Sequence, residues 1–185
     1  FALLGSGCVP KIVRLHEAGD HEGVVSEAAK RKRPPKGKAA RALAASLAAL
    51  GKDERARSVL TYDFRHGGSV ESLLDLADME LEQGSDGLAA AHYVRAVELE
   101  KTVVSKRPNA PAVCDLFRRR ARAFLSVGEA MAADADMRRV FELCGVSSDA
   151  SIAANDADLR AAIEPEADRL VRARQAFEPC ADDCS

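Results

Sequence analysis

The chain has 185 residues, of which 30% are charged and 4% aromatic, with no tryptophan and a formal net charge of −2 at pH 7. This length suits one domain that buries a stable core. The near-neutral charge argues against a nucleic-acid-binding protein, and the shortage of aromatic residues argues against a sugar-binding cleft. The sequence holds no Gly-x-Ser-x-Gly turn, phosphate-binding glycine loop or Cys-x-x-Cys-His motif. We therefore expect no enzyme activity, no cofactor and no metal.

The chain starts with an apolar stretch, residues 1–4, followed by Gly-Ser-Gly and then Cys8. This arrangement resembles the end of a bacterial lipoprotein signal peptide. The resemblance implies that residues 1–8 are a signal-peptide remnant with its lipobox and that Cys8 is lipidated. It places the protein on the periplasmic side of a bacterial cell envelope, lipid-anchored to the outer membrane. The alternative is an ordinary apolar helix start with a free thiol.

Four glycines organise the rest of the chain: Gly19, Gly51, Gly84 and Gly128 are spaced 32, 33 and 44 residues apart. Apolar residues recur every three to four positions on both sides of each glycine, which is typical of amphipathic helices. Glycine ends a helix readily because it adopts the left-handed backbone conformation without steric cost. The sequence therefore predicts an all-α fold of antiparallel helical hairpins. We interpret the long last spacing as a helix extended through residues 98–106.

Alanines recur at fixed distances from these glycines. They lie seven residues before a glycine or five residues after it, and they are Ala44, Ala77, Ala121, Ala56, Ala89 and Ala133. This spacing resembles the tetratricopeptide repeat (TPR) family, whose motif is a pair of antiparallel helices of about 34 residues. The resemblance covers roughly residues 9–145 and implies hairpins stacked as a short solenoid. The alternative is an irregular all-α bundle whose loops happen to contain glycine.

A dense basic loop is expected between the first two hairpins. Residues 1–66 hold 13 Lys and Arg against 7 Asp and Glu, a net of +6, which leaves −8 for the rest of the chain. Next to a bilayer such a loop would gain roughly 1 kcal/mol per basic residue from anionic headgroups. We expect it to face the membrane surface, the alternative being a solvated loop. Its cations are Lys30, Arg31, Lys32, Arg33 and Lys36.

The TPR family holds peptides or partner helices on the concave face formed by the first helix of each hairpin. The resemblance therefore implies a non-enzymatic scaffold that binds another protein in a membrane-associated complex, as an accessory or assembly subunit. The alternative is a soluble periplasmic adaptor or chaperone that binds exported peptides. The mixture of charge and leucine on this face suits a polypeptide better than a small-molecule substrate. Carried onto this sequence, the concave positions are Lys38, Arg41, Glu71, Asp78, Leu81, Asp115, Arg118, Arg122 and Leu125.

Four cysteines remain besides the one at position 8, and they allow three pairings. Cys114 lies 14 residues before Gly128 and Cys144 lies 16 residues after it. A hairpin folded at this glycine brings both to its open end, which predicts a Cys114–Cys144 disulfide and leaves Cys180 to pair with Cys184. Such bonds persist outside the reducing cytosol. The alternative is that the cysteines within helices are free, buried, small apolar residues.

Residues 146–185 are expected to form a helical cap and a polar tail. We expect a turn over residues 145–151, a short helix over 156–163 and a last helix that starts at Pro165 and runs to Phe177. An apolar stripe on this last helix would cover the open end of the solenoid, as terminal repeats must.

Overall fold

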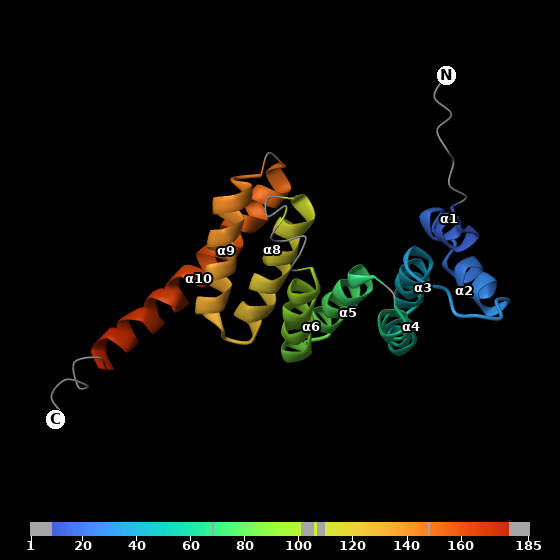
Figure 1. The fold of residues 1–185 in the computed structure, drawn as a ribbon, viewed down its shortest axis with the longest axis horizontal. Helices are drawn as coiled ribbons and strands as arrows, with labels where there is room; N and C mark the ends of the chain where they lie inside the picture. Colours follow the sequence, from blue (N-terminus) through green and yellow to red (C-terminus); the bar gives the residue numbers. More distant parts are fainter. Residues whose placement is uncertain (1–8, 68, 101–105, 107–109, 148, 178–185) are drawn as a thin grey trace, which may run out of the picture. The chain divides into compact units, whose positions relative to one another are not determined.

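The computed structural model describes residues 9–67, 69–100, 106, 110–147 and 149–177 (Figure 1). All regular secondary structure within these ranges is helical, which confirms the predicted all-α class. The chain divides into two compact units, residues 1–79 and 80–185. The predictions for residues 1–8 and for Cys180 and Cys184 lie outside the described residues. The helices are α1 (Lys11–Glu17), α2 (His21–Ala29), α3 (Lys38–Ala49), α4 (Asp53–Arg65), α5 (Val70–Glu82), α6 (Asp86–Leu99), α8 (Pro111–Ser126), α9 (Ala130–Cys144) and α10 (Ala150–Phe177).

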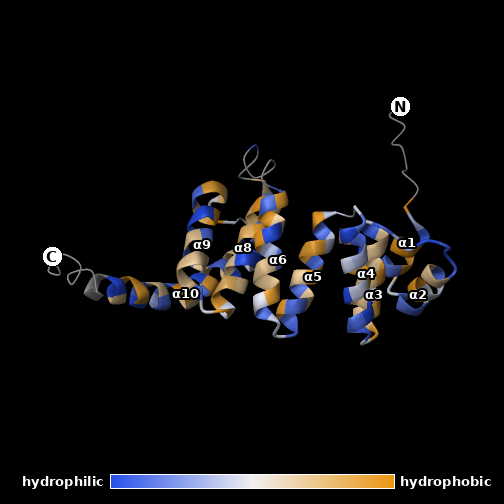
Figure 2. Ribbon diagram, turned by 60° about the horizontal axis from the view of Figure 1, so that its bottom comes forward, coloured by the Kyte–Doolittle hydropathy of each residue, from blue (hydrophilic) through white to orange (hydrophobic). Residues whose placement is uncertain are grey.

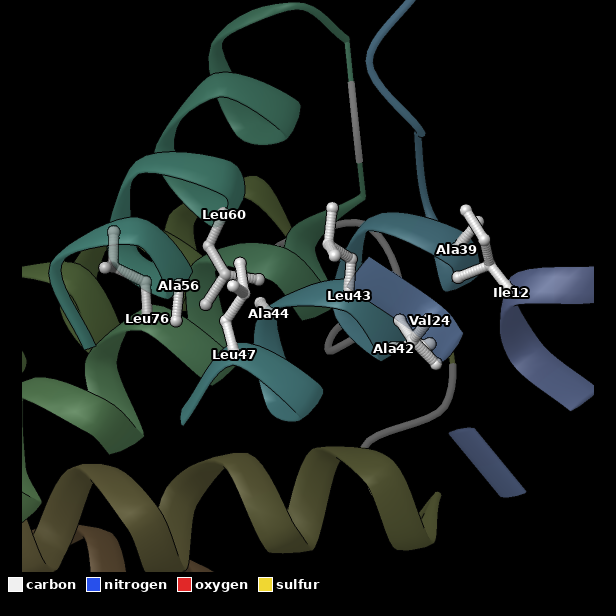
Figure 3. Close-up of a cluster of buried hydrophobic side chains, with 10 residues drawn as sticks. All are labelled: Ile12, Val24, Ala39, Ala42, Leu43, Ala44, Leu47, Ala56, Leu60 and Leu76. Atoms are coloured by element: carbon white, nitrogen blue, oxygen red, sulfur yellow. The ribbon is translucent and has the colours of Figure 1, made fainter. Parts of the chain in front are cut away.

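The first unit is built on α1 to α4 and the larger part of α5, with consecutive helices packed as antiparallel pairs. Its core takes apolar side chains from all five helices (Figure 3). Leu43 and Leu47 lie one turn apart on α3, and the side chains of Leu47 and of Leu60 on α4 point toward each other (Figure 3). Ala44 and Ala56 are almost completely buried, at 1% and 0% exposure, so small side chains stand where α3 and α4 approach each other.

The second unit contains α6, α8, α9 and α10, and its core lies mainly among the last three helices. Phe117 of α8, Met137 of α9 and Ile163 of α10 are each at most 2% exposed. Ala121 and Ala133 occupy the contact between α8 and α9 and are fully buried. The alanines that suggested close helix pairs are therefore buried in this unit as well.

The four glycines of the repeat pattern end helices as predicted. Gly19, Gly51, Gly84 and Gly128 all have positive φ, between 67° and 81°. After each of them, the next residue donates its backbone N–H to the carbonyl five positions earlier, at 2.7 to 2.9 Å. This hydrogen bond defines the Schellman motif, which satisfies carbonyls that a helix end leaves unpaired. The sequence thus located four turns correctly.

Two expected helix boundaries are wrong. The helix that was expected to continue through residues 98–106 ends at Leu99 in α6. The rest of that expected helix falls largely on residues 101–105, which lie outside the described residues.

The two C-terminal helices expected on either side of Pro165 are a single helix, α10. A proline inside a helix costs about 3 kcal/mol because it removes a hydrogen bond and crowds the preceding turn. Pro165 is exposed, whereas Ile163 and Ala167 on either side of it are buried in the core shared with α9. Their burial holds the helix together across the proline.

Candidate partner-binding cleft

The nine predicted partner-binding residues are divided between the two units. Four lie in the first unit and five in the second. Three residues of α8, Asp115, Arg118 and Arg122, line one cleft of about 660 Å³ in the second unit. The structure therefore brings one part of the predicted set together.

This cleft is bounded by α8, by the turn after α9 and by the first turns of α10. It combines charged side chains with apolar ones, and Val146 and Ile152 are 77% and 39% exposed. The lining residues are Pro111, Cys114, Asp115, Arg118, Arg122, Cys144, Val146, Ser147, Ile152, Asn155 and Asp156.

A buried ion pair joins the two walls of the cleft. The Nε of Arg118 donates to both carboxylate oxygens of Asp156, at 2.7 and 2.9 Å. The two side chains are only 12% and 3% exposed, so each depends on the other to compensate for its lost hydration. Arg118 was predicted to contact a partner, but its guanidinium is already engaged in holding α10 against α8.

A disulfide between Cys114 and Cys144 lies in the same cleft. The two Cα atoms are 6.4 Å apart, within the usual range for a disulfide. The bond joins the start of α8 to the end of α9, which is the pairing expected from a hairpin folded at Gly128. It fixes the open end of this hairpin and the turn that leads into α10.

Two charged groups of the cleft remain accessible. Arg122 is exposed and makes no ion pair with any residue that the structure describes. Asp115 pairs with Arg119 one helical turn away, at 2.7 Å, but its side chain stays 51% exposed. With Val146 and Ile152 nearby, the cleft can accept an apolar side chain together with a carboxylate that pairs with Arg122.

Another arginine of α8, Arg120, has a structural role that the sequence did not predict. Arg120 donates two hydrogen bonds of 2.6 Å to Asp136 of α9, and the side chains are 13% and 4% exposed. Its guanidinium carbon lies 5.3 and 5.5 Å from the ring centres of Phe117 and Phe124. These phenylalanines stand three residues before Arg120 and four after it, so the helical period places all three on one face. That spacing was the signal available in the sequence.

The predicted residues of the first unit form a smaller charged group. Arg41 of α3 donates to both carboxylate oxygens of Asp75 of α5, at 2.5 and 3.0 Å. The pKa of Glu71 is lowered, first by a hydrogen bond from the Ser69 side chain and to a lesser extent by the charge of Arg41. Lys38 is exposed. Arg41 is thus held between carboxylates of its own unit.

The remaining predicted residues are partly buried. Asp78 and Leu81 of α5 are each half-buried, and Asp78 has a partner within the protein. Leu125 packs against the core of the second unit. All five cations of the basic loop are exposed, and the Nζ of Lys36 donates to the His66 carbonyl at 2.8 Å.

The histidines near the N-terminus lie in a polar cluster. The Nδ1 atoms of His16 and His21 are 3.0 and 3.2 Å from the Oγ of Ser46, whose side chain is fully buried. Ser46 thereby ties α1 and α2 to α3. Among the described residues, no group of three or more His, Cys, Asp or Glu side chains could hold a metal ion.

Comparison with known proteins gives a distant likeness to solved structures, one of which is described here. No family model matches the chain, and no curated protein matches it. The C-terminal part of a TPR repeat-containing protein from Cytophaga hutchinsonii is similar to it with a TM-score of 0.40 and 18% identity, over 84% of this chain and 71% of that one. This likeness is too distant to inform function. None of the described helices is long and apolar enough to cross a bilayer.

Proposed function

We propose that this protein is a non-enzymatic scaffold whose cleft between α8 and α10 binds a segment of another protein. The observation that supports this proposal is the convergence of Arg122, Asp115, Val146 and Ile152 on one open cleft. A polypeptide offers apolar side chains and carboxylates at the spacing of a few ångströms that such a surface requires. The antiparallel helix pairs supply a rigid surface rather than reactive groups.

The cleft is held in shape before any partner arrives. The Cys114–Cys144 disulfide fixes one end, and the buried pair of Arg118 with Asp156 fixes the other wall. A preformed site loses less conformational freedom on binding, so more of the contact energy appears as affinity. Arg122 then selects for a carboxylate, because its guanidinium can donate two parallel hydrogen bonds to that group.

Site-specific photocrosslinking in the native cell tests this proposal. A photoreactive residue at Ile152, which lines the cleft, is expected to capture a defined protein partner. The same residue at Met131, which is 47% exposed and does not line the cleft, is the matched control. The partner should also disappear when Arg122→Glu is added to the Ile152 probe. Equal capture from both positions, or none from Ile152, contradicts the proposal.

We further propose that this scaffold works in a bacterial cell envelope, anchored to the outer membrane through a lipid on Cys8, within a larger complex. The disulfide supports a compartment outside the reducing cytosol. Mass spectrometry of the native N-terminus is expected to find a lipid-modified cysteine, and Cys8→Ser should release the protein from the membrane fraction. An unmodified peptide that begins before Cys8 would favour the alternative, a soluble periplasmic adaptor or chaperone that binds exported peptides.

A further inference from the structure

A second concave surface lies in the first unit, among α2, α3, α4 and the basic loop. This surface, the α2–α4 groove, has a volume of about 310 Å³. Leu43 and Leu47 lie at its base, 7% and 1% exposed, and Val25 and Val59 are half-buried beside them. The lining residues are Val25, Ala28, Ala29, Pro34, Pro35, Leu43, Leu47, Arg55, Ser58 and Val59.

Positive charge flanks this apolar groove from two elements. Pro34 and Pro35 of the basic loop line it, and the loop carries exposed cations at positions 30–33 and 36. Figure 2 shows the loop that joins α2 to α3 in hydrophilic colours. Arg55 of α4 also lines the groove; it is exposed and makes no ion pair with the residues the structure describes.

The nearby negative charge does not neutralise the loop. Glu27 of α2 is close enough for the charges of Lys30 and Arg31 to contribute to its lowered pKa. The largest cause of that lowering is a hydrogen bond from Lys11, whose Nζ lies 3.0 Å from the Glu27 carboxylate. Glu27 is therefore already paired with a residue of α1, and the loop cations at positions 30–33 remain available to a partner.

We propose that the α2–α4 groove binds an acidic amphipathic helix of a partner protein. An amphipathic helix places an apolar stripe into a groove at positions i, i+3, i+4 and i+7. Residues that flank the stripe lie at the edges of the groove, where glutamate or aspartate can meet the cations of the basic loop and Arg55. An apolar groove with cations on the loop and on α4 beside it is complementary to that helix. This inference is independent of the cleft in the second unit.

The shape of the apolar surface favours a helix over a lipid bilayer as the occupant. Peripheral proteins bind bilayers by inserting protruding apolar side chains between headgroups. Among the described residues of the first unit, the large apolar side chains with more than a third of their surface exposed are Val9 and Tyr62, and neither lines the groove. The apolar surface beside the loop is hollow, so it accepts side chains rather than presenting them.

Titration calorimetry with the full chain and three designed helical peptides tests this proposal. The first peptide carries leucines at i, i+3, i+4 and i+7 with flanking glutamates. The second has lysines in place of the glutamates, and the third has serines in place of the leucines. The acidic amphipathic peptide is expected to bind saturably, and to bind at least tenfold more tightly than either of the others.

Two variants separate the apolar and charged contributions. Val59→Asp places a carboxylate in the groove and is expected to weaken acidic-peptide binding by at least tenfold. Removing three rim cations with Arg31→Gln, Arg33→Gln and Arg55→Gln should weaken it roughly threefold to tenfold, because exposed pairs each contribute modestly. The matched control Arg14→Gln removes an exposed cation that does not line the groove and should leave affinity unchanged. Circular dichroism confirms that each variant keeps its helical content.

Vesicles of phosphatidylglycerol and phosphatidylcholine provide the competing test. One result would contradict the proposal: the wild-type chain and the Val59→Asp variant bind these vesicles equally well, and neither binds any of the peptides at concentrations up to about 1 mM. The loop is then a membrane element, and the proposal is overturned. The proposal is equally overturned if the acidic peptide binds no better than the lysine peptide, or binds the Val59→Asp variant unchanged.

Discussion

The pair formed by Arg118 and Asp156 gives a strong test of how the cleft is built. We predict that Asp156→Ala destabilises the second unit, because it leaves a guanidinium group 12% exposed with no carboxylate to compensate for its lost hydration. Breaking a buried ion pair by removing one partner costs about 3–5 kcal/mol. Arg118 lines the cleft and can turn toward water, so we expect a value near the lower limit, about 3 kcal/mol.

Replacing both partners should behave differently. In Arg118→Met with Asp156→Leu, no charge is buried, and apolar residues of similar volume replace a buried pair at little cost or with a gain in stability. The matched control is Glu166→Ala, which breaks an exposed pair with Arg169 whose side chains are 49% and 72% exposed. Its cost should stay below about 1 kcal/mol. The double variant therefore recovers most of what the single variant loses.

Hydrogen exchange of the α8 amides measures this effect in the second unit alone, because each amide reports the opening free energy of its own region. We expect the wild type and the double variant to have similar opening free energies. The value for Glu166→Ala should be slightly lower, and that for Asp156→Ala should be the lowest by a wide margin. A loss of less than about 1 kcal/mol in Asp156→Ala would refute the reasoning, because the pair would then behave as a solvated one. So would a double variant that loses as much as Asp156→Ala.

Three further predictions concern the disulfide, a turn and a carboxylate. Reduction of the Cys114–Cys144 bond, which closes a loop with a sequence separation of 30, should lower stability by about 3–4 kcal/mol; a melting temperature unchanged by dithiothreitol would contradict this. Gly128→Ala should cost about 1–2 kcal/mol in urea unfolding, because φ is 81° there and a side chain disfavours that region; a neutral result would mean that the turn has rearranged. The lowered pKa of Glu71 implies stability that is complete above its ordinary pKa of 4.5 and is lost as the pH falls through the folded-state value. Ser69→Ala should return the Glu71 titration, followed by carboxyl NMR, toward 4.5, and an unmoved midpoint would exclude this hydrogen bond as the main cause.

The sequence predicted the hairpin turns well because their cause is local. A glycine with positive φ and a carbonyl bond five residues back are properties of one short segment, and Gly51 and Gly128 both show them. The Cys114–Cys144 bond was equally accessible, because the two cysteines stand at nearly equal distances from Gly128. The break expected at Pro165 failed for the opposite reason. Burial of neighbouring side chains against α9 overrides the local preference of proline, and that burial cannot be read from the segment alone.

The candidate site was less predictable because the role of a charge depends on what lies opposite it. Arg118 and Arg122 stand one helical turn apart on α8, and the sequence gives no reason to separate them. Asp156 is 38 residues away from Arg118 in the chain, yet it buries that arginine and leaves Arg122 exposed. The position of α10 determines which of the two arginines is paired within the protein and which is left for an external partner. The sequence had predicted two helices in place of α10.

The difference between paired and exposed charges also predicts that the two proposed binding surfaces respond differently to salt. In the cleft, the charge left for a partner is that of Arg122 and the partly paired Asp115, so binding there depends mainly on shape and apolar contact. Beside the α2–α4 groove, five exposed loop cations and Arg55 act together. Attraction between exposed charges is screened over about 8 Å at physiological ionic strength. Raising the salt concentration should therefore weaken binding at the groove steeply and binding at the cleft only slightly. Equal salt dependence at both surfaces would mean that Asp156 does not neutralise Arg118 as the structure indicates.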